Sequence, residues 1–274
     1  MKGVNPVACS AAATAFDQIA GIYDNVFTRS SIGRAQRKQV WSSLLLGFPR
    51  GSRLLELNCG TGEDSRFLAA LGRSIVACDV SKAMIDIARE RAAMEGYEDE
   101  RLKYLQVANE ELELLHGAGC FDGAFSNFSG LNCLDDIAPV AAKLAKLVRP
   151  QGRVLICLWS RLCLAEGIWF LLHGQPKKAI RRLWGKARAR IGDIRISVSY
   201  PTVTAIRRAF SPWFHLESHR AVGLFVPPSY AEDWIRPRQK LLSWMEQMDT
   251  RFAQKPLLRN LGDHVLLEFV RCPH

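Results

Sequence analysis

Two glycines and one carboxylate stand at a spacing that can bind the sugar of a cofactor. An apolar run ending at Leu57 is followed by a turn containing Gly60 and Gly62, and a second apolar run ends at Asp79, seventeen residues beyond Gly62. Glycines let a backbone approach a ligand closely, and an acid at the end of the second strand can accept both hydroxyls of a ribose. The spacing therefore predicts a strand, a turn, a helix and a second strand that bind an adenosine-type cofactor.

The other residues of the turn disfavour the common phosphate-bearing cofactors. A dinucleotide fingerprint needs glycines where the chain has Asn58, Gly60 and Glu63, so a nicotinamide-dependent oxidoreductase is a poor match. No Gly-Lys-Ser or Gly-Lys-Thr triplet is present. Glu63 and Asp64 stand where a helix start would receive pyrophosphate, and two carboxylates there would repel it. S-adenosylmethionine fits better, because it has a ribose, a sulfonium and an ammonium but no phosphate.

On these residues the chain resembles the class I S-adenosylmethionine-dependent methyltransferases. Their first motif is an acid followed by glycines at alternate positions, and here it reads Glu56-Leu57-Asn58-Cys59-Gly60-Thr61-Gly62, with Asn58 replacing the first glycine. The second motif is matched by Cys78-Asp79-Val80-Ser81. The third is degraded, and its adenine-binding role passes to Asn109 or a backbone group. A fourth, from Phe121 to Phe128, places Asn127 beside the ammonium of the cofactor.

The resemblance covers roughly residues 16 to 160 and returns near the C-terminus. It implies an α/β fold with a doubly wound, mostly parallel, seven-stranded Rossmann-like sheet, helical lid insertions, and S-adenosylmethionine as the cofactor. It also implies the cofactor-binding residues, which are Tyr23, Glu56, Asn58, Gly60, Gly62, Asp79, Val80, Asn109 and Asn127.

The chain divides into four expected parts. They are a helical flap over residues 1–50, a cofactor-binding core over 51–160, a basic helical lid over 161–194, and the rest of the sheet over 195–274 with a second helical insertion near 229–261. The third part is expected to be an amphipathic helix. Apolar side chains recur there at helical spacing, and basic ones recur on the opposite side at intervals of four: Ile180, Leu183, Trp184, Ala187 and Ile191 against Lys178, Arg182, Lys186 and Arg190.

Charge is concentrated in the second half of the chain. The net charge is +10, but residues 1–150 carry 17 Lys and Arg against 18 Asp and Glu, whereas residues 151–274 carry 20 against 9. This indicates an acidic partner or substrate. For the basic lid face we keep three interpretations: a solvated surface, an anionic membrane, or an acidic carrier protein bound through Lys178, Arg182 and Lys186. Nucleic acid is disfavoured, because aromatic residues are not interleaved with the basic ones.

Composition predicts a cytoplasmic protein, with peripheral membrane association left open. No apolar run approaches the ~20 residues that span a bilayer, and the first 20 residues do not read as a signal peptide. Eight cysteines occur without any C-x-x-C pair, which favours reduced thiols over disulfides or a metal site, and no metal is expected.

The expected acceptor is small and apolar, and an anionic or carrier-bound molecule is left open. Its pocket is expected to use Asn132, Trp159 and His173, with further aromatic surface from Trp169, Phe170, Trp184 and Trp234. O- or N-methylation is slightly favoured, in natural-product or lipid tailoring. A neutral hydroxyl would benefit from a general base, and the candidates are His173, His219 and His264, none of which the sequence singles out.

Two further alternatives stay open. One is a methyltransferase-like enzyme, a cyclase or decarboxylase, that binds the cofactor without donating its methyl group. The other is a non-enzymatic adenosyl-binding scaffold, which Asn58 and the degraded third motif keep in consideration.

Overall fold

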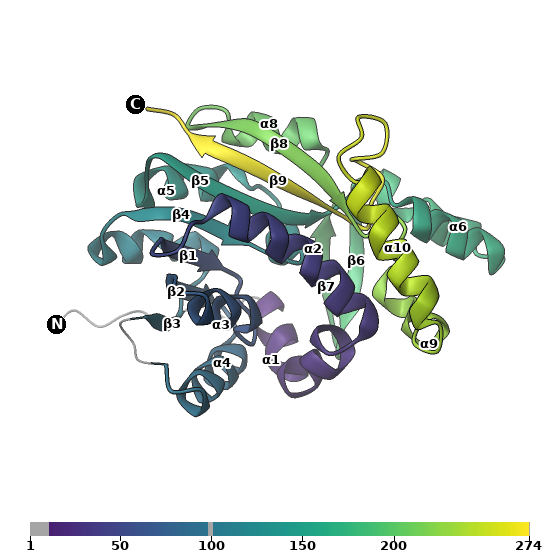
Figure 1. The fold of residues 1–274 in the computed structure, drawn as a ribbon, viewed down its shortest axis with the longest axis horizontal. Coiled ribbons are helices and arrows are strands. Elements are labelled where there is room, and N and C mark those ends of the chain that lie inside the picture. Colours follow the sequence, from purple (N-terminus) through teal and green to yellow (C-terminus); the bar gives the residue numbers. More distant parts are fainter. Residues whose placement is uncertain (1–10, 98–100, 274) are drawn as a thin grey trace.

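The fold is built on one seven-stranded sheet with helices on both faces (Figure 1). The structure is a computed structural model and describes residues 11–97 and 101–273. The strand order is β3-β2-β1-β4-β5-β9-β8, with β1 to β5 parallel and β9 antiparallel to both β5 and β8. The predicted doubly wound α/β sheet is confirmed. Its strands are β1 (Arg53–Leu57), β2 (Ser74–Asp79), β3 (Leu102–Gln106), β4 (Phe121–Ser126), β5 (Val148–Trp159), β8 (Phe214–Val222) and β9 (His264–Arg271).

Strand alternation divides the apolar residues between two cores. Successive side chains of a strand point to opposite faces of the sheet, so Leu54 joins one cluster while Leu55 and Leu57 join the other. Because helices cover both faces, the parallel strands are apolar almost throughout. One face is covered by α2 (Ser31–Gly47), α3 (Glu63–Ala70) and α4 (Lys82–Met94), and the other by η2 (Asn109–Ala118), α5 (Ala138–Leu147) and α8 (Val203–Phe210).

The N-terminal flap is docked against the core by two acids. Of the flap predicted over residues 1–50, this part consists of α1 (Ala11–Tyr23) and the π-helical turn η1 (Asp24–Thr28), whereas α2 covers one face of the sheet; residues 1–10 lie outside the described residues. Asp17 accepts hydrogen bonds from Ser81 Oγ at 2.5 Å and from Ala83 N at 3.0 Å. Asp24 accepts one from Thr61 Oγ1 at 2.7 Å and pairs with Arg91. The flap is therefore held beside the turn that follows β1.

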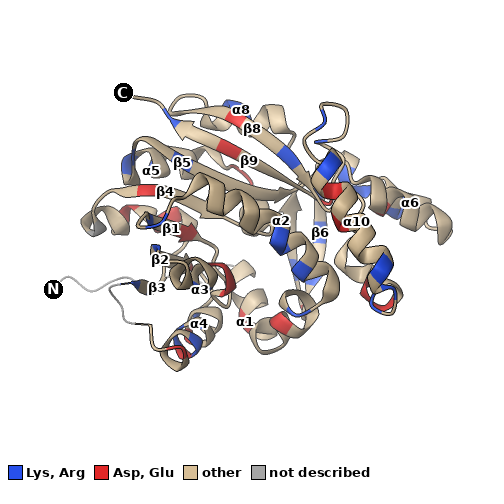
Figure 2. Ribbon diagram, in the orientation of Figure 1, with Lys and Arg blue, Asp and Glu red and all other residues tan. Residues whose placement is uncertain are grey.

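The prediction of a basic amphipathic helix over residues 161–194 is wrong. The segment forms α6 (Leu164–Leu172), α7 (Pro176–Ala179) and the single turn η4 (Arg181–Trp184), and then the two-stranded hairpin β6 (Lys186–Ile191) and β7 (Ile194–Ser199). Along β6, exposed basic residues alternate with partly buried apolar ones, which is the period of a strand. The ribbon of α6 is almost entirely tan in Figure 2, whereas acidic and basic residues are intermixed on α4.

The helices expected near 229–261 are present. They are η5 (Ser229–Ala231), α9 (Glu232–Ile235) and α10 (Gln239–Phe252). Glu232 accepts hydrogen bonds from Ser31 N at 2.8 Å and Ile32 N at 3.0 Å, so this insertion caps the first turn of α2. Of the described helices, none combines the length and apolar character that crossing a membrane requires.

Candidate cofactor and acceptor site

A cavity of about 290 Å³ opens at the carboxyl ends of the parallel strands. Strand β1 lies between β2 and β4, so the chain leaves β1 in one direction and returns on its other side at β4. Ligands of open α/β sheets bind outside such a reversal of strand order. The cavity is lined by residues that follow β1, β2, β3 and β4 and by the flap: Ala11, Ala12, Phe16, Tyr23, Asn58, Gly60, Asp79, Val80, Met84, Asn109, Glu110, Asn127, Phe128 and Gly130, together with Cys133, Leu134, Arg195, Ile196 and Ser197.

Seven of the nine predicted cofactor residues lie in this lining. They are Tyr23, Asn58, Gly60, Asp79, Val80, Asn109 and Asn127. The other two, Glu56 and Gly62, stand behind it. Gly62 lies against the ring of Tyr104, which would overlap any added Cβ. Glycine is therefore needed at this position for packing. The binding roles of all nine stay predictions, but the fold brings seven of them to one cavity.

Asp79 is fixed at the end of β2 by two backbone donors. Its Oδ2 accepts a hydrogen bond from Gly60 N and its Oδ1 accepts one from Ser81 N, both at 2.9 Å. Burial raises the pKa of Asp79, and these two hydrogen bonds oppose the rise. Each oxygen keeps a further lone pair, so the carboxylate can still accept hydrogen bonds from two ribose hydroxyls.

Asn58 fits the turn because Gly130 has no side chain. Asn58 adopts a left-handed conformation with φ 55°, which asparagine tolerates better than most residues. Its Oδ1 accepts a hydrogen bond from Ser126 Oγ at 3.1 Å. A Cβ added at Gly130 would overlap the side chain of Asn58. The departure from the first glycine of the motif is therefore accommodated by a glycine on the neighbouring loop.

This pairing predicts a rescue. Gly130→Ala should weaken S-adenosylmethionine binding and destabilise the fold by about 1–3 kcal/mol, because the new methyl group overpacks Asn58. Adding Asn58→Gly removes the clashing atoms, and glycine accepts the left-handed φ, so the double variant should regain most of the loss. Calorimetry and urea unfolding measure both effects. A double variant no better than Gly130→Ala would contradict the pairing.

Asp64 is the centre of a buried polar cluster, not a bare charge at the turn. It pairs with Arg37, and its Oδ1 also accepts a hydrogen bond from Trp41 Nε1 at 2.7 Å. Its Oδ2 accepts one from Asn127 Nδ2 at 2.9 Å. Glu63 pairs with Arg66 at 2.6 Å. Both acids are thus neutralised by arginines, so the repulsion of phosphate expected from sequence is weaker than two free carboxylates would produce.

Buried acceptors at the site fit the ammonium of S-adenosylmethionine. The Nδ2 of Asn127 is used by Asp64, and its Oδ1 has no hydrogen-bond partner among the described residues. Oε2 of Glu56, behind the cavity lining, also has no hydrogen-bond partner among the described residues; burial and then Asp64 raise the pKa of Glu56 well above its ordinary value, so a positive charge nearby would be needed to keep it ionised. An unpaired buried acceptor is costly, and a donor with positive charge would satisfy it. These unpaired oxygens therefore fit the ammonium group of this cofactor.

A second, more apolar cavity of about 360 Å³ adjoins the first. The two share the lining residues Phe16, Tyr23, Phe128, Cys133 and Ile196, so they meet along one wall. Phe128 and Ser129, which follow β4, take left-handed φ values of 50° and 74°. Such conformations in non-glycine residues store strain and cluster at binding sites. The second cavity is the candidate place for the acceptor.

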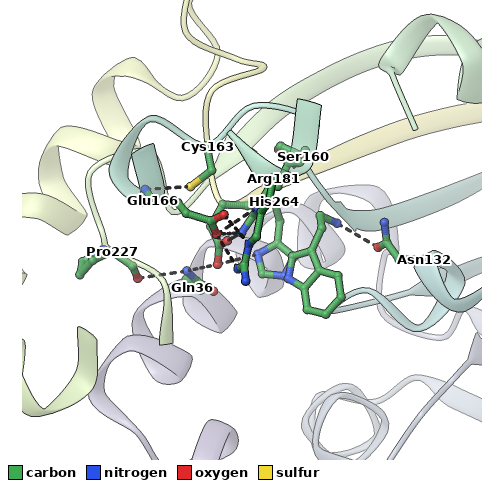
Figure 3. A network of polar contacts seen from close by, with 11 residues as sticks. Gln36, Asn132, Ser160, Cys163, Glu166, Arg181, Pro227 and His264 are labelled. Atoms are coloured by element: carbon green, nitrogen blue, oxygen red, sulfur yellow. Dashed lines mark hydrogen bonds and ion pairs between the residues drawn. The ribbon is translucent and has the colours of Figure 1, made fainter. Parts of the chain in front are cut away.

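His264, labelled in Figure 3, is buried and lines this second cavity, and its neighbour Asp263 lines the cavity as well. Its Nδ1 stands 3.4 Å from Asp263 Oδ2, and its ring contacts Phe128 edge-on and lies near Trp159. Burial lowers the pKa of His264 to about 4, although Asp263 opposes the shift. Asp263 in turn pairs with Arg182 at 2.7 Å. Burial alone would raise the pKa of Asp263, but His264 and Arg182 outweigh it and lower the pKa.

The substrate residues predicted from sequence separate in the structure. Trp159 lines the second cavity. Asn132 lines neither cavity: its Nδ2 donates to Ser199 O at 2.7 Å and its Oδ1 accepts from Trp159 N at 3.0 Å, so it joins β5 to the hairpin. His173 is exposed at the end of α6, stacked on Trp169, and lies outside both cavities. Neither of these two polar residues lines the candidate acceptor cavity, and their roles in acceptor binding stay predictions.

The other lid residues also need correction. Trp169, Phe170 and Trp234 contact Tyr230 or one another in a separate cluster, and Trp184 is exposed, so of the predicted aromatic residues only Trp159 lines the acceptor cavity. Lys178, Arg182 and Lys186 do not share a face. Arg182 is buried between two carboxylates, and Lys186 pairs with Asp135 at 2.6 Å. His219 lies on β8 and contacts Asn260, away from both cavities.

Comparison with known proteins agrees with the site. The model of the methyltransferase domain family matches residues 54–152. A demethylmenaquinone methyltransferase of Clavibacter sepedonicus is 30% identical over 53% of this chain and 56% of its own length. A malonyl-[acyl-carrier protein] O-methyltransferase of Pectobacterium atrosepticum is 29% identical over 61% of each chain. The chain thus spans less than two thirds of the length of these curated relatives.

Solved structures share the fold over almost the whole chain. The [4+2]-cyclase SpnF superposes with a TM-score of 0.61 at 14% identity, covering 96% of both chains. The DhpI–SAH complex superposes with a TM-score of 0.59 at 15% identity, covering 96% of this chain and 97% of the other. At these identities the likeness shows the fold. The matched residues 54–152 are thus a methyltransferase domain, for which S-adenosylmethionine is the cofactor, in a chain that shares the fold of these solved structures.

Proposed function

We propose that the protein transfers the methyl group of S-adenosylmethionine to a small, apolar acceptor, on oxygen or nitrogen, in natural-product or lipid tailoring. The observation that carries this proposal is the pair of adjoining cavities. One holds Asp79, Gly60 and Asn127, and the other has mainly apolar walls. The domain match and the names of the relatives support methyl transfer in general.

The residues of the first cavity would bind and orient the cofactor. When bound, S-adenosylmethionine supplies a methyl group activated by a positively charged sulfur. Asp79 accepts the hydroxyls of the ribose, and Asn127 offers its free Oδ1 to the ammonium. Gly60 leaves open space, with only the ring of Tyr23 near its missing side chain at 3.9 Å. Holding two reactants in line supplies much of the rate when one of them is already activated.

If the methyl group is transferred to a hydroxyl, His264 is the candidate general base that takes the hydroxyl proton. Nδ1 lies 3.4 Å from Asp263 Oδ2 but makes no hydrogen bond among the described residues, so a small rotation of the ring would let a proton on Nδ1 meet that carboxylate and leave the lone pair of Nε2 for the acceptor. A hydroxyl oxygen that gains a methyl group becomes strongly acidic, so even a weak base can take its proton. Asp263 then stabilises the charged ring, and Trp159 and Phe128 exclude water from it.

His264 should remain neutral far below the usual titration range of histidine. Because burial lowers its pKa to about 4, the unfolded chain binds a proton near pH 6.5 that the folded protein does not. The free energy of unfolding should therefore fall as pH drops from about 6.5 to 4. In His264→Gln this part of the fall should disappear. Histidine-labelled NMR titration measures the pKa, with His264→Gln assigning the signal. Titration near 6.5 would contradict this account.

Methyl transfer itself is tested with purified protein and isotope-labelled S-adenosylmethionine. The panel should contain apolar phenols, apolar amines, free fatty acids and carrier-bound acids, together with demethylmenaquinone and malonyl-[acyl-carrier protein], which the names of the relatives suggest. We expect the gain of one labelled methyl group on an apolar member and equal accumulation of S-adenosylhomocysteine. Cofactor binding without turnover of any class would count against the proposal.

A second candidate function follows from the fold. The [4+2]-cyclase SpnF has the same fold over nearly its whole length. If this chain likewise uses the cofactor for structure, a substrate would be converted without S-adenosylhomocysteine being formed. The same incubation separates the two functions, because only methyl transfer consumes the cofactor. Absence of any cofactor binding would instead favour a non-enzymatic scaffold.

A further inference from the structure

An apolar patch is exposed on α6 and the turns that follow it. Six of its residues line one open groove of about 320 Å³, so they form a continuous surface. Leu172 and Trp184 are exposed by 80% and 78%, which is unusual for side chains of this size. The members that line the groove are Leu162, Leu164, Ile168, Leu171, Ile180 and Leu183, and Leu172 and Trp184 complete the patch.

Within the segment that carries the patch, the charges are nearly all positive. From residue 161 to 190 the chain has eight Lys and Arg but one acid, Glu166. That acid is 1% exposed and is used internally by Arg181 and Arg182. Lys177 and Lys178 are exposed and have no acidic partner among the described residues. The surface of this segment thus offers apolar side chains and positive charge, without an acidic side chain of its own.

We propose that this patch docks on a lipid bilayer containing anionic lipids. Interfacial helices bury Leu, Ile and Trp at the level of the headgroups while Lys and Arg contact lipid phosphates. A second copy of the chain would bring two positive surfaces together, which is unfavourable. An acidic protein could bind the lysines. Binding to such a partner would not explain why exposed aliphatic side chains cover α6, which has no exposed acid.

The patch is connected to the acceptor cavity through a buried ion-pair chain. Glu166 of α6 pairs with Arg182, and Arg182 pairs with Asp263, which lines the acceptor cavity beside His264. Glu166 and His264 are labelled in Figure 3. Seated on a bilayer, α6 would place that cavity near apolar molecules dissolved in the membrane. This reading of the acceptor's source rests on the proposed function, whereas the docking surface itself does not.

Vesicle co-sedimentation tests the proposal with the full chain. We expect binding to vesicles of phosphatidylcholine and phosphatidylglycerol, weakened by salt, and little binding to phosphatidylcholine alone. Leu171→Glu/Leu172→Glu should reduce the partition coefficient by about tenfold or more. The matched control is Leu46→Glu, since Leu46 on α2 is 87% exposed but distant in sequence and lies outside this groove. It should bind like the unaltered protein.

A charge-reversal pair tests the electrostatic part. Lys177→Glu/Lys178→Glu should weaken binding by about tenfold or more, whereas Arg207→Glu/Arg208→Glu on α8, with the same change in net charge, should have a much smaller effect. Equal losses in both pairs would show a dependence on net charge alone and would overturn the assignment of the surface.

Three other outcomes would also overturn it. They are no binding to either vesicle, loss of a dimer in Leu171→Glu/Leu172→Glu by light scattering, and capture of acyl carrier protein with no vesicle binding. Calorimetry with S-adenosylmethionine keeps this failure distinct from that of the proposed function. Variants that still bind the cofactor but never bind vesicles reject the docking surface alone.

Discussion

Asp79→Ala should weaken S-adenosylmethionine binding by about two orders of magnitude. Hydrogen bonds to a charged group are worth about 1.5–3 kcal/mol each, and the variant would lose the two bonds to the ribose hydroxyls. Each loss of about 1.4 kcal/mol weakens binding tenfold. Asp79→Asn keeps one accepting oxygen and should lose less. Isothermal titration calorimetry measures both. Asp86→Ala is the matched control, because Asp86 lies on the adjacent helix α4 and pairs only with exposed Lys82.

A ligand change separates ribose binding from general damage to the turn. Asp79 also accepts hydrogen bonds from Gly60 N and Ser81 N, so its loss loosens the backbone. The unaltered protein should bind S-adenosylhomocysteine much more tightly than its 2′-deoxyribose analogue. Asp79→Ala should bind the two alike. If the variant still binds S-adenosylhomocysteine more tightly than the deoxyribose analogue, or if its affinity is unchanged, the carboxylate does not bind the ribose.

The core of the fold was predictable because its signals are local. The apolar runs at 54–57 and 75–78 carry no polar face except Glu56, as expected of strands covered by helices on both sides. The glycines between Leu57 and Glu63 indicate a tight turn there. These features depend on residues close in sequence, so the order of strands and helices in the cofactor half could be read directly.

The hairpin β6–β7 was misread although its signal was present. Apolar residues from Ile180 to Ile191 recur at helical spacing, but within Lys186–Ile191 basic and apolar residues also alternate with a period of two. Gly192 and Asp193 form a two-residue loop, with Ile191 paired to Ile194 across it. A Gly-Asp pair between alternating runs is typical of a tight hairpin. The period of two and this loop together outweigh the helical spacing.

The role of Arg182 could not be derived from sequence, because its partners are distant. Arg182 lies 16 residues from Glu166 and 81 from Asp263. Its Nη2 contacts both carboxylates, at 2.6 and 2.7 Å, and its Nη1 donates to Asp263 O at 2.8 Å. The planar guanidinium presents five N–H donors in a fixed fork, whereas a lysine presents a single ammonium with three. A residue expected to face a partner is instead the buried link between α6 and β9.

Arg182→Leu should therefore lower the free energy of unfolding by about 3–5 kcal/mol, since it leaves two buried carboxylates without their shared cation. Arg181 retains contact with Glu166, which limits the loss, whereas the side chain of Asp263 keeps, among the described residues, the polar neighbours Gln36 and His264. Urea unfolding measures the change. Lys186→Leu is the matched control: its partner Asp135 is exposed, so the expected cost is about 0–1 kcal/mol.

A second readout shows that Arg182 acts on the acceptor cavity as well as on stability. The guanidinium disfavours a proton on His264, so Arg182→Leu should raise the pKa of His264, whereas Lys186→Leu should leave it unchanged. Histidine-labelled NMR at a pH where the variant stays folded measures this shift. If Arg182→Leu destabilises the protein but the pKa of His264 does not rise, Arg182 is a structural clamp only. If both change, the ion pair that holds α6 also sets the protonation of the one histidine in the acceptor cavity, among the residues that line it.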